Sequence, residues 1–158
     1  MVKVSAGLLM FSFKDNKLYV FLVHNGGPFF KNKDNGFWSI PKGEVDNPNE
    51  DLFNVAKREM IEETSIIPPE NISEYIFLGK IKQKNNKIVY AWAFKGVFDV
   101  KFNCNSYFEI EVYGKRQRFP EIDIGRYFEI NEAKLKINSV QLEFINRLIE
   151  ILKQKGDM

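Results

Sequence analysis

The sequence predicts an α/β fold, a three-layer α/β/α sandwich in which a central sheet carries one helix on each face. Three observations support this prediction. Pairs of apolar, β-branched or aromatic segments are joined by short polar stretches, as in β-hairpins. Two segments carry apolar residues at helical spacing, one in the first half of the chain and one near its end. The chain has 158 residues, 44% hydrophobic and 15% aromatic, which predicts one domain, residues 1–158, with a substantial core.

The first 40 residues are expected to form a hairpin, a loop and a short strand. Segments 4–13 and 18–23 are the predicted strands, because both are apolar and the four residues between them favour a turn. Residues 25–36 are too rich in glycine and lysine for a core element and are expected to form a loop. Residues 37–40 then return as a strand that delivers residues 41–43 to the front of a helix.

That helix is predicted to run from about Pro48 to Thr64. Asn47, Pro48 and Glu50 form a capping-box pattern with proline at the first helical position. Two prolines beginning at Pro68 forbid continuation of the helix. The apolar residues that recur at helical spacing are Leu52, Phe53, Val55, Ala56 and Met60.

The second half of the chain contains further strands and a final helix. Segments 72–82 and 88–97 are predicted to pair as a second hairpin, and segments 107–113 and 126–129 are further strand candidates. The helix is expected to begin after residues 138–139, where Asn and Ser can cap it. Its apolar stripe predicts that it lies on the sheet, opposite the first helix.

The first helix ends with three carboxylates in one narrow sector. At about 100° per residue, Glu62 lies roughly 60° to one side of Glu59 and Glu63 roughly 40° to the other. A run of glutamates is most often a solvated face, but these three continue the apolar stripe of Leu52 and Val55. Carboxylates crowded together repel one another unless a proton, an arginine or a divalent cation joins them. Oxygen ligands alone select Mg²⁺ or Mn²⁺ over zinc.

The residues from Gly43 to Ile66 resemble the Nudix box. That pattern is Gly, five residues, Glu, seven residues, Arg-Glu, an aliphatic residue, any residue, Glu-Glu, any residue, Gly and an aliphatic residue. From Glu50 to Glu63 the match is in register. Six residues rather than five separate Gly43 from Glu50, and Ser65 stands where the family has glycine. The extra residue falls in a loop, and serine at a left-handed helix cap costs on the order of 1 kcal/mol.

Outside the box the likeness covers roughly the whole chain. The stretches AGLLMF, FLVHNGGPFF, FWSIPKGE and FPEIDIGRYFEINEAK are similar to the bacterial Nudix group often called predicted NTP pyrophosphohydrolases. Residues 38–43 are also similar to the WxxPKG segment of diadenosine tetraphosphate hydrolases and RNA 5′-pyrophosphohydrolases. The resemblance implies the order of the strands and a Nudix-type sandwich with a central mixed sheet.

The resemblance also implies roles for individual residues. Glu59, Glu62 and Glu63 are expected to be catalytic ligands of Mg²⁺ or Mn²⁺, with Arg58 orienting Glu59 and the main-chain carbonyl of Gly43 as a further ligand. Family members often add a carboxylate from outside the box, as metal ligand or general base. Glu121 is the candidate in this chain, with Glu109 and Glu111 as alternatives.

Substrate contacts are less clearly marked by the sequence. Lys42 precedes the metal-binding turn and is expected to meet a phosphate, although a lysine in a turn is normally solvated. Trp38 is taken as a second substrate contact, and His24 is open to either a phosphate contact or a structural role. The aromatic residues that compete for base stacking are Phe29, Phe30, Phe37, Trp38 and Tyr107.

The implied reaction is metal-dependent hydrolysis of a diphosphate linkage in a small nucleotide, either a dinucleoside polyphosphate or a nucleoside triphosphate. Two alternatives remain. One is a Nudix-fold nucleotide-binding module without turnover. The other is an RNA 5′-pyrophosphohydrolase, which needs a basic groove and is disfavoured by the net charge of +2.

Composition limits the remaining function classes. Nucleic acid is not the expected partner, because the basic runs 80–87 and 115–118 are typical of solvated hairpin tips. No stretch approaches the ~18 apolar residues of a membrane span, so no membrane partner is expected. The lone cysteine, Cys104, cannot form an intrachain disulfide, which suits the reducing cytoplasm.

Overall fold

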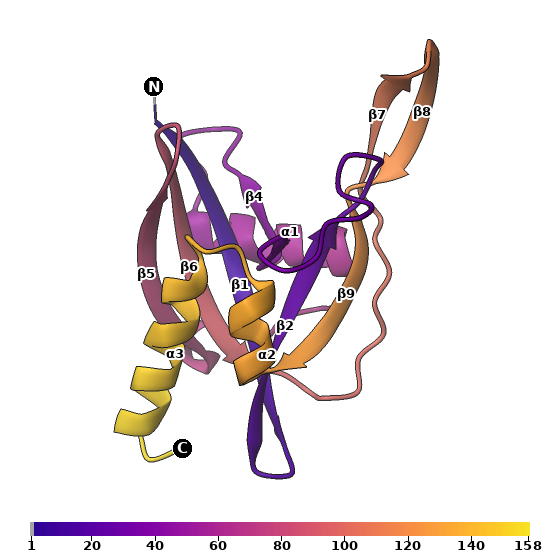
Figure 1. Ribbon diagram of the computed structural model, residues 1–158. Coiled ribbons are helices and arrows are strands. Elements are labelled where there is room, and N and C mark those ends of the chain that lie inside the picture. The colour runs from indigo at the N-terminus through magenta and orange to yellow at the C-terminus, as the bar shows by residue number, and fades with distance from the viewer. Residues whose placement is uncertain (1) are drawn as a thin grey trace.

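The computed structural model describes residues 2–158, and a mixed seven-stranded sheet lies at its centre (Figure 1). The strand order is β3-β2-β1-β6-β5, with β4 paired to β1 and β9 paired to β2. β1 and β6 run parallel, and the other pairs are antiparallel. The predicted α/β sandwich with a mixed sheet is therefore confirmed. The strands of this sheet are β1 (Lys3–Lys14), β2 (Lys17–Asn25), β3 (Trp38–Ser39), β4 (Lys42–Glu44), β5 (Tyr75–Gln83), β6 (Lys87–Lys95) and β9 (Ile122–Glu129).

Helices cover both faces of the sheet. On one face, Ala6, Leu8 and Met10 of β1 pack in a core cluster with α1 (Leu52–Thr64). On the other face, Leu9 and Phe11 belong to a second cluster with α2 (Ile130–Lys136) and α3 (Leu142–Gln154). Figure 1 shows α1 behind the sheet and the other two helices in front. The final helix thus lies opposite the first, as predicted from its apolar stripe.

The predicted start of α1 at Pro48 is wrong. The helix begins at Leu52, with Asp51 as its N-cap accepting a hydrogen bond from the Phe53 N–H at 3.2 Å. The capping-box contact does form, because the Glu50 carboxylate accepts from the Asn47 N–H at 3.1 Å. It closes a turn that precedes the helix. The sequence pattern of a capping box is the same whether it lies at the start of a helix or in such a turn.

The hairpins also differ in part from the prediction. β7 (Tyr107–Val112) and β8 (Lys115–Pro120) form a separate two-stranded sheet that projects from the body (Figure 1). The basic run 115–118 is therefore a strand and not a hairpin tip, and the tip is Tyr113 and Gly114, both with positive φ. The run 80–87 does contain a tip, as expected, at the turn between β5 and β6.

Two short helical elements were not predicted. Residues 72–74 form a 3-10 turn, η1 (Ile72–Glu74), capped by the Asn71 side chain, so β5 begins at Tyr75. Helix α2 follows β9 directly, and the Glu129 carboxylate caps it by accepting from the Asn131 N–H at 3.0 Å. A glutamate at an N-cap is a weak sequence signal, since Ser, Thr, Asp and Asn are the usual caps.

Candidate active site

The candidate site lies where the C-terminal half of α1 faces the turn before β4. Pairing of β4 with β1 places Gly43 opposite Ala6 and Lys42 opposite Gly7. Gly43 lies so close to Glu59 that a Cβ on this residue would overlap the Glu59 carboxyl group. The Lys42 N–H donates to Glu63 Oε1 at 3.3 Å. The backbone of residues 42–43 is therefore in direct contact with two of the predicted carboxylates.

The three carboxylates of α1 differ in exposure. Glu63 is 6% exposed and continues the buried face formed by Val55, Ala56 and Met60. The Glu59 side chain is 15% exposed, whereas that of Glu62 is 47% exposed. The predicted direction of the carboxylates toward the protein body therefore holds for Glu63 and Glu59, while Glu62 lies at the solvent edge of the cluster.

Burial dominates the electrostatics of the two inner carboxylates. It raises the pKa of Glu63 to about 8, with repulsion from Glu59 as the next cause. Burial likewise raises the pKa of Glu59 to about 7, with repulsion from Glu62 next. Glu121 at the start of β9 raises both pKa values further. The structure thus brings Glu121 to the same site as the α1 carboxylates, although it lies far away in the sequence.

Arg58 connects the carboxylates to the loop before the helix. Its Nη1 lies 2.8 Å from Glu50 Oε2, while Nη2 lies 3.8 Å from Glu59 Oε1 and Nε 3.9 Å from Glu62 Oε1. The hydrogen bond from Arg58 lowers the pKa of Glu50 below its usual value. The strongest partner of Arg58 is therefore Glu50, and the extra residue in the loop does not separate these two positions. The sequence predicted that Arg58 orients Glu59, and its contact with Glu50 was not predicted.

The donor set fits a hard divalent cation. Glu59, Glu62, Glu63 and Glu121 offer carboxylate oxygens, and Gly43 offers a carbonyl beside them. Within residues 2–158 no three acidic, histidine or cysteine side chains are already drawn together as a metal site. Instead, Glu59 and Glu62 lean toward Arg58 and Glu63 accepts from Lys42. Two neighbouring buried carboxylates with raised pKa values are the environment that a divalent ion compensates.

A four-residue segment, 103–106, links the end of α1 to Glu121, and we call it the strut. The Asn105 N–H donates to the Glu62 carbonyl at 2.9 Å, and the Asn103 N–H donates to the Thr64 carbonyl at 3.0 Å. At the other end of the strut, the Glu121 N–H donates to the Ser106 carbonyl at 2.8 Å. One stretch of backbone therefore fixes the position of Glu121 relative to the carboxylates at the end of α1. No local sequence pattern predicted this link.

Ser65 caps α1 in the left-handed conformation that its position in the box predicted. Its φ is 63° and ψ is 11°, and its N–H donates to the Ile61 carbonyl. The Ser65 hydroxyl donates to the Asn103 carbonyl at 2.6 Å and accepts from the Asn105 side-chain amide at 2.7 Å. Serine therefore adds two contacts to the strut that glycine lacks, and these contacts offset the strain of its backbone.

Of the two predicted substrate residues, Lys42 lies at the site and Trp38 lies in the core. Lys42 lies beside Glu63, and burial lowers the pKa of its amine against the opposing effect of Glu63. Trp38 is 6% exposed, donates from Nε1 to Asp34 at 2.9 Å and belongs to the core cluster on the α3 side. The structure does not bring Trp38 to the carboxylates, so its role as a substrate contact stays a prediction that this burial disfavours.

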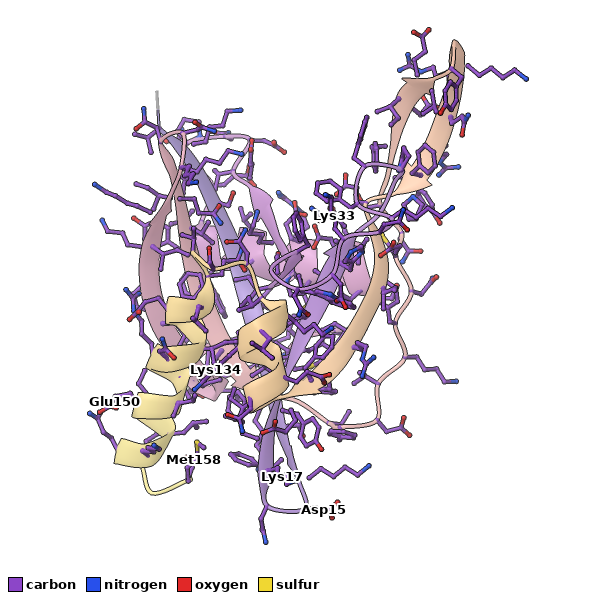
Figure 2. All side chains as sticks on the ribbon, viewed as in Figure 1. Asp15, Lys17, Lys33, Lys134, Glu150 and Met158 are labelled. Carbon is purple, nitrogen blue, oxygen red and sulfur yellow. The ribbon has the colours of Figure 1, made fainter. Side chains whose placement is uncertain are left out.

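His24 has a structural environment. It is 4% exposed, and its Nδ1 lies 2.8 Å from Asp123 Oδ1 while its Nε2 lies 2.6 Å from the Lys33 carbonyl. These contacts fasten the loop that carries Lys33, labelled in Figure 2, to the edge of the sheet. Of the two readings of His24, this geometry favours the structural one.

Comparisons with known proteins agree with this fold. The NUDIX domain model matches residues 1–148. No curated protein matches the chain. A Caenorhabditis elegans Ap4A hydrolase binary complex has a similar structure, with a TM-score of 0.64 and 18% identity over 97% of this chain and 99% of that one. The NUDIX domain of Shewanella oneidensis NrtR, complexed with ADP ribose, has a TM-score of 0.63 and 16% identity, covering 96% and 89%.

A MutT protein from Methanosarcina mazei Go1 is similar at a TM-score of 0.58 and 20% identity, covering 96% of each chain. These identities show a shared fold, while the family match covers nearly the whole chain and includes the Arg58, Glu59, Glu62 and Glu63 positions. Together with the geometry of the carboxylates, it shows that the chain belongs to the NUDIX domain family, and we class it as a Nudix hydrolase.

Proposed function

We propose that this protein uses Mg²⁺ or Mn²⁺ to hydrolyse a diphosphate linkage in a nucleotide. The observation that carries the proposal is the pair of buried carboxylates, Glu59 and Glu63, with Glu121 beside them. Burying carboxylates without a positive partner is costly, so a cluster of this kind supports a cation-binding role over a purely structural one. The residues that would hold the ion are Gly43, Glu59, Glu62, Glu63 and Glu121.

A bound divalent ion would polarise the phosphate oxygens and make a bound water more acidic. The residues of the chain supply the rest. Arg58 holds Glu59 and Glu62 in place from the Glu50 side, and Lys42 offers a positive group beside Glu63. Positioning and charge compensation account for most of phosphoryl-transfer catalysis.

Glu121 is our choice for the general base that accepts a proton from the attacking water. It lines the same pocket as Glu63, its charge raises the pKa values of Glu59 and Glu63, and its main chain is fixed by the strut. The two alternatives, Glu109 and Glu111, alternate onto the same face of the projecting hairpin, and Glu109 lies 3.2 Å from Arg116. Neither is tied to the end of α1 as Glu121 is.

We further propose that the substrate is a small nucleotide, with dinucleoside polyphosphates and nucleoside triphosphates as the leading choices. The similarity to an Ap4A hydrolase supports the first of these. An NrtR complexed with a 27mer DNA is also among the similar structures, but the net charge of +2 gives little support for a nucleic-acid substrate. No helix of residues 2–158 is long and apolar enough to cross a membrane. We place the reaction in the cytoplasm because Cys104 is free and buried.

The test is a panel of nucleotides assayed with Mg²⁺, Mn²⁺ and chelator, with products identified by mass. We expect metal-dependent release of phosphate or nucleotide that is lost in the Glu62→Gln and Glu63→Gln variants. Glu150→Gln on the exposed side of α3 is the matched control and should keep full activity. Full activity in the Glu62 and Glu63 variants would contradict the proposal.

The alternative is a binding module without turnover, and the ADP ribose complex of the NrtR NUDIX domain gives it some support. A module of this kind has no need of the repulsion between Glu59 and Glu63, which this chain retains. The same panel separates the two, because a binding module would bind a nucleotide in the presence of metal and release no product.

A further inference from the structure

A pocket of about 240 Å³ adjoins the carboxylate cluster. Glu63 and Glu121 belong to both, so whatever fills the pocket lies next to the proposed reaction centre. Two aromatic side chains line it: Phe30 comes from the loop after β2, and Phe108 comes from β7 at the base of the projecting hairpin. Asn25 adds a carboxamide.

The loop and the base of the hairpin are held together by backbone contacts. The Gly26 N–H donates to the Glu121 carbonyl at 2.8 Å. Gly27 has a φ of 93°, and a Cβ on it would fall 2.6 Å from Phe108 Cζ. The Phe108 ring therefore rests on the bare backbone of Gly27, and both glycines are needed for the close approach. The pocket is thus supported by backbone and not by flexible side chains.

The hairpin has an apolar face that begins at this pocket with Phe108. Phe108, Ile110 and Val112 alternate onto one side of β7, and Phe119 of β8 lies opposite Phe108 in the register, with ring centroids 5.9 Å apart. These side chains are half-exposed, and Figure 2 shows the hairpin extending away from the body. An isolated two-stranded hairpin is only marginally stable in water, so a ligand that covers apolar area at its base is favourable.

We propose that this pocket binds the nucleobase of the substrate, with Phe30 and Phe108 contacting the planar ring and the Asn25 carboxamide bonding to its edge. The inference rests on the proposed function, because Glu63 and Glu121 would hold the diphosphate part of the same molecule. A carboxamide offers both donors and an acceptor, as the edge of a base requires. This chemistry distinguishes a nucleobase from a purely apolar group or from inorganic phosphate.

The experiment measures binding separately from turnover. Dissociation constants in Mg²⁺ are determined by calorimetry for the four nucleoside monophosphates and for ribose 5-phosphate, which has the same phosphate and sugar without the base. We expect the tightest monophosphate to bind better than ribose 5-phosphate. Phe108→Ala and Phe30→Ala should weaken the binding of that monophosphate by about 5-fold or more, the usual effect of losing one aromatic stacking partner. Neither variant should change the binding of ribose 5-phosphate.

Two matched controls and three further variants accompany them. Phe29→Ala changes a neighbouring ring that is 70% exposed and outside the pocket, and Tyr113→Ala changes the fully exposed hairpin tip; neither should alter binding. Phe108→Ala also removes packing on Gly27, so two other substitutions at this position separate packing from stacking. Phe108→Leu keeps an apolar contact but no ring and should still weaken binding, whereas Phe108→Trp keeps a ring and should bind as the wild type does. Asn25→Asp should change the order of preference among the four bases.

The outcomes separate this inference from the proposed function. Equal binding of the monophosphates and ribose 5-phosphate overturns the nucleobase pocket, and so does wild-type affinity in both Phe108→Ala and Phe30→Ala. If the monophosphates bind through Phe108 but no nucleotide is hydrolysed, the pocket stands and the hydrolase proposal fails. If inorganic tripolyphosphate is cleaved as fast as the best nucleotide, and Phe30→Ala and Phe108→Ala do not slow the cleavage of either compound, the hydrolase proposal stands and the nucleobase pocket is overturned.

Discussion

The two ends of α1 place their carboxylates in opposite environments. Just before the helix, the hydrogen bond from Arg58 lowers the pKa of Glu50. In the last turns, burial raises the pKa values of Glu59 and Glu63 to about 7 and about 8. Arg58 lies 2.8 Å from Glu50 but 3.8 Å from Glu59. The arginine therefore compensates mainly the outer carboxylate, and the inner pair keeps the raised pKa values that support the proposed cation site.

The largest effect is expected from neutralising a carboxylate in the last turns of α1. Glu63→Gln should lower kcat/KM by about 10²-fold or more, the size of effect expected when a preorganised electrostatic group is removed. In chelator at pH 8 it should also raise the free energy of unfolding, because a buried charge has been removed. Steady-state kinetics and urea unfolding measure the two effects. Glu62→Gln should lower activity without the gain in stability, because Glu62 is half-exposed. A loss of stability in Glu63→Gln would contradict this account.

The carboxylates at the two ends of α1 should also change the free energy of unfolding in opposite directions as pH changes. Glu59 and Glu63 have raised pKa values in the folded state, so the folded protein keeps their protons between about pH 4.5 and 8 while the unfolded chain releases them. In chelator the free energy of unfolding should therefore fall with rising pH across this window, by up to about 1.4 kcal/mol per pH unit for each of the two groups while its protonation differs between the folded and unfolded states.

Glu50 contributes in the opposite sense, because its pKa is lowered in the folded state: its stabilisation is lost as pH falls below about 4.5. Urea unfolding at a series of pH values, with and without Mg²⁺, tests both ends. Saturating Mg²⁺ should remove the decline above pH 5, because it binds the ionised carboxylates. A stability that rises with pH from 5 to 8 in chelator would exclude the burial of Glu59 and Glu63 as the dominant effect.

A milder change releases the arginine from the outer end. In Glu50→Gln the negative charge of the main partner of Arg58 is lost, so the guanidinium should turn toward Glu59 and Glu62 and compete with the metal ion. We expect Mn²⁺ affinity to fall by about 10-fold, the lower end of the range for groups that support metal ligands, with activity restored at high Mn²⁺. Calorimetry measures the affinity. Glu70→Gln, an exposed partner of Lys57, is the control. Unchanged affinity in Glu50→Gln would show that Arg58 is held by other contacts.

The smallest expected effect concerns the cap of the helix. Ser65→Ala keeps the positive φ and loses both contacts of the hydroxyl with the strut, so it should destabilise the fold by about 1–2 kcal/mol. Ser65→Gly loses the same contacts but relieves roughly 1 kcal/mol of backbone strain, and should remain close to the wild type. Urea unfolding of both variants measures the difference. Equal stability of the two variants would mean that the strain of φ at residue 65 is negligible.

Local patterns predicted the parts of the molecule that depend on local forces. Continuous apolar segments around a polar turn located β1 and β2, and the turn at Asp15 and Asn16 has the positive φ values that such residues tolerate. The angular count along α1 predicted that Glu63 continues the buried face, as burial now shows. Periodicity is sufficient for these features because each is decided within a few residues of the chain.

Features that depend on distant partners were missed. The Asn47–Glu50 box closes a turn before the helix, and Glu50 is bound there to Arg58, eight residues further on. β8 reads as a solvated basic run, and its strand conformation follows only from pairing with β7. The strut has no periodicity, and its role comes from hydrogen bonds to Glu62, Thr64 and Glu121, which the sequence does not place beside it. Tertiary contacts of this kind leave no signal in a local window.

The hydrogen bond between the Glu121 N–H and the Ser106 carbonyl has a consequence for how such a chain can diversify. It closes the base of the β7–β8 hairpin, so residues 107–120 form a loop whose two ends stay fixed whatever its content. Exchange or shortening of the distal part of this loop leaves the spacing between Glu121 and the end of α1 untouched. If Phe108 at its base contacts the ligand as we propose, the hairpin is an exchangeable module through which the choice of ligand can change while the carboxylate cluster is retained.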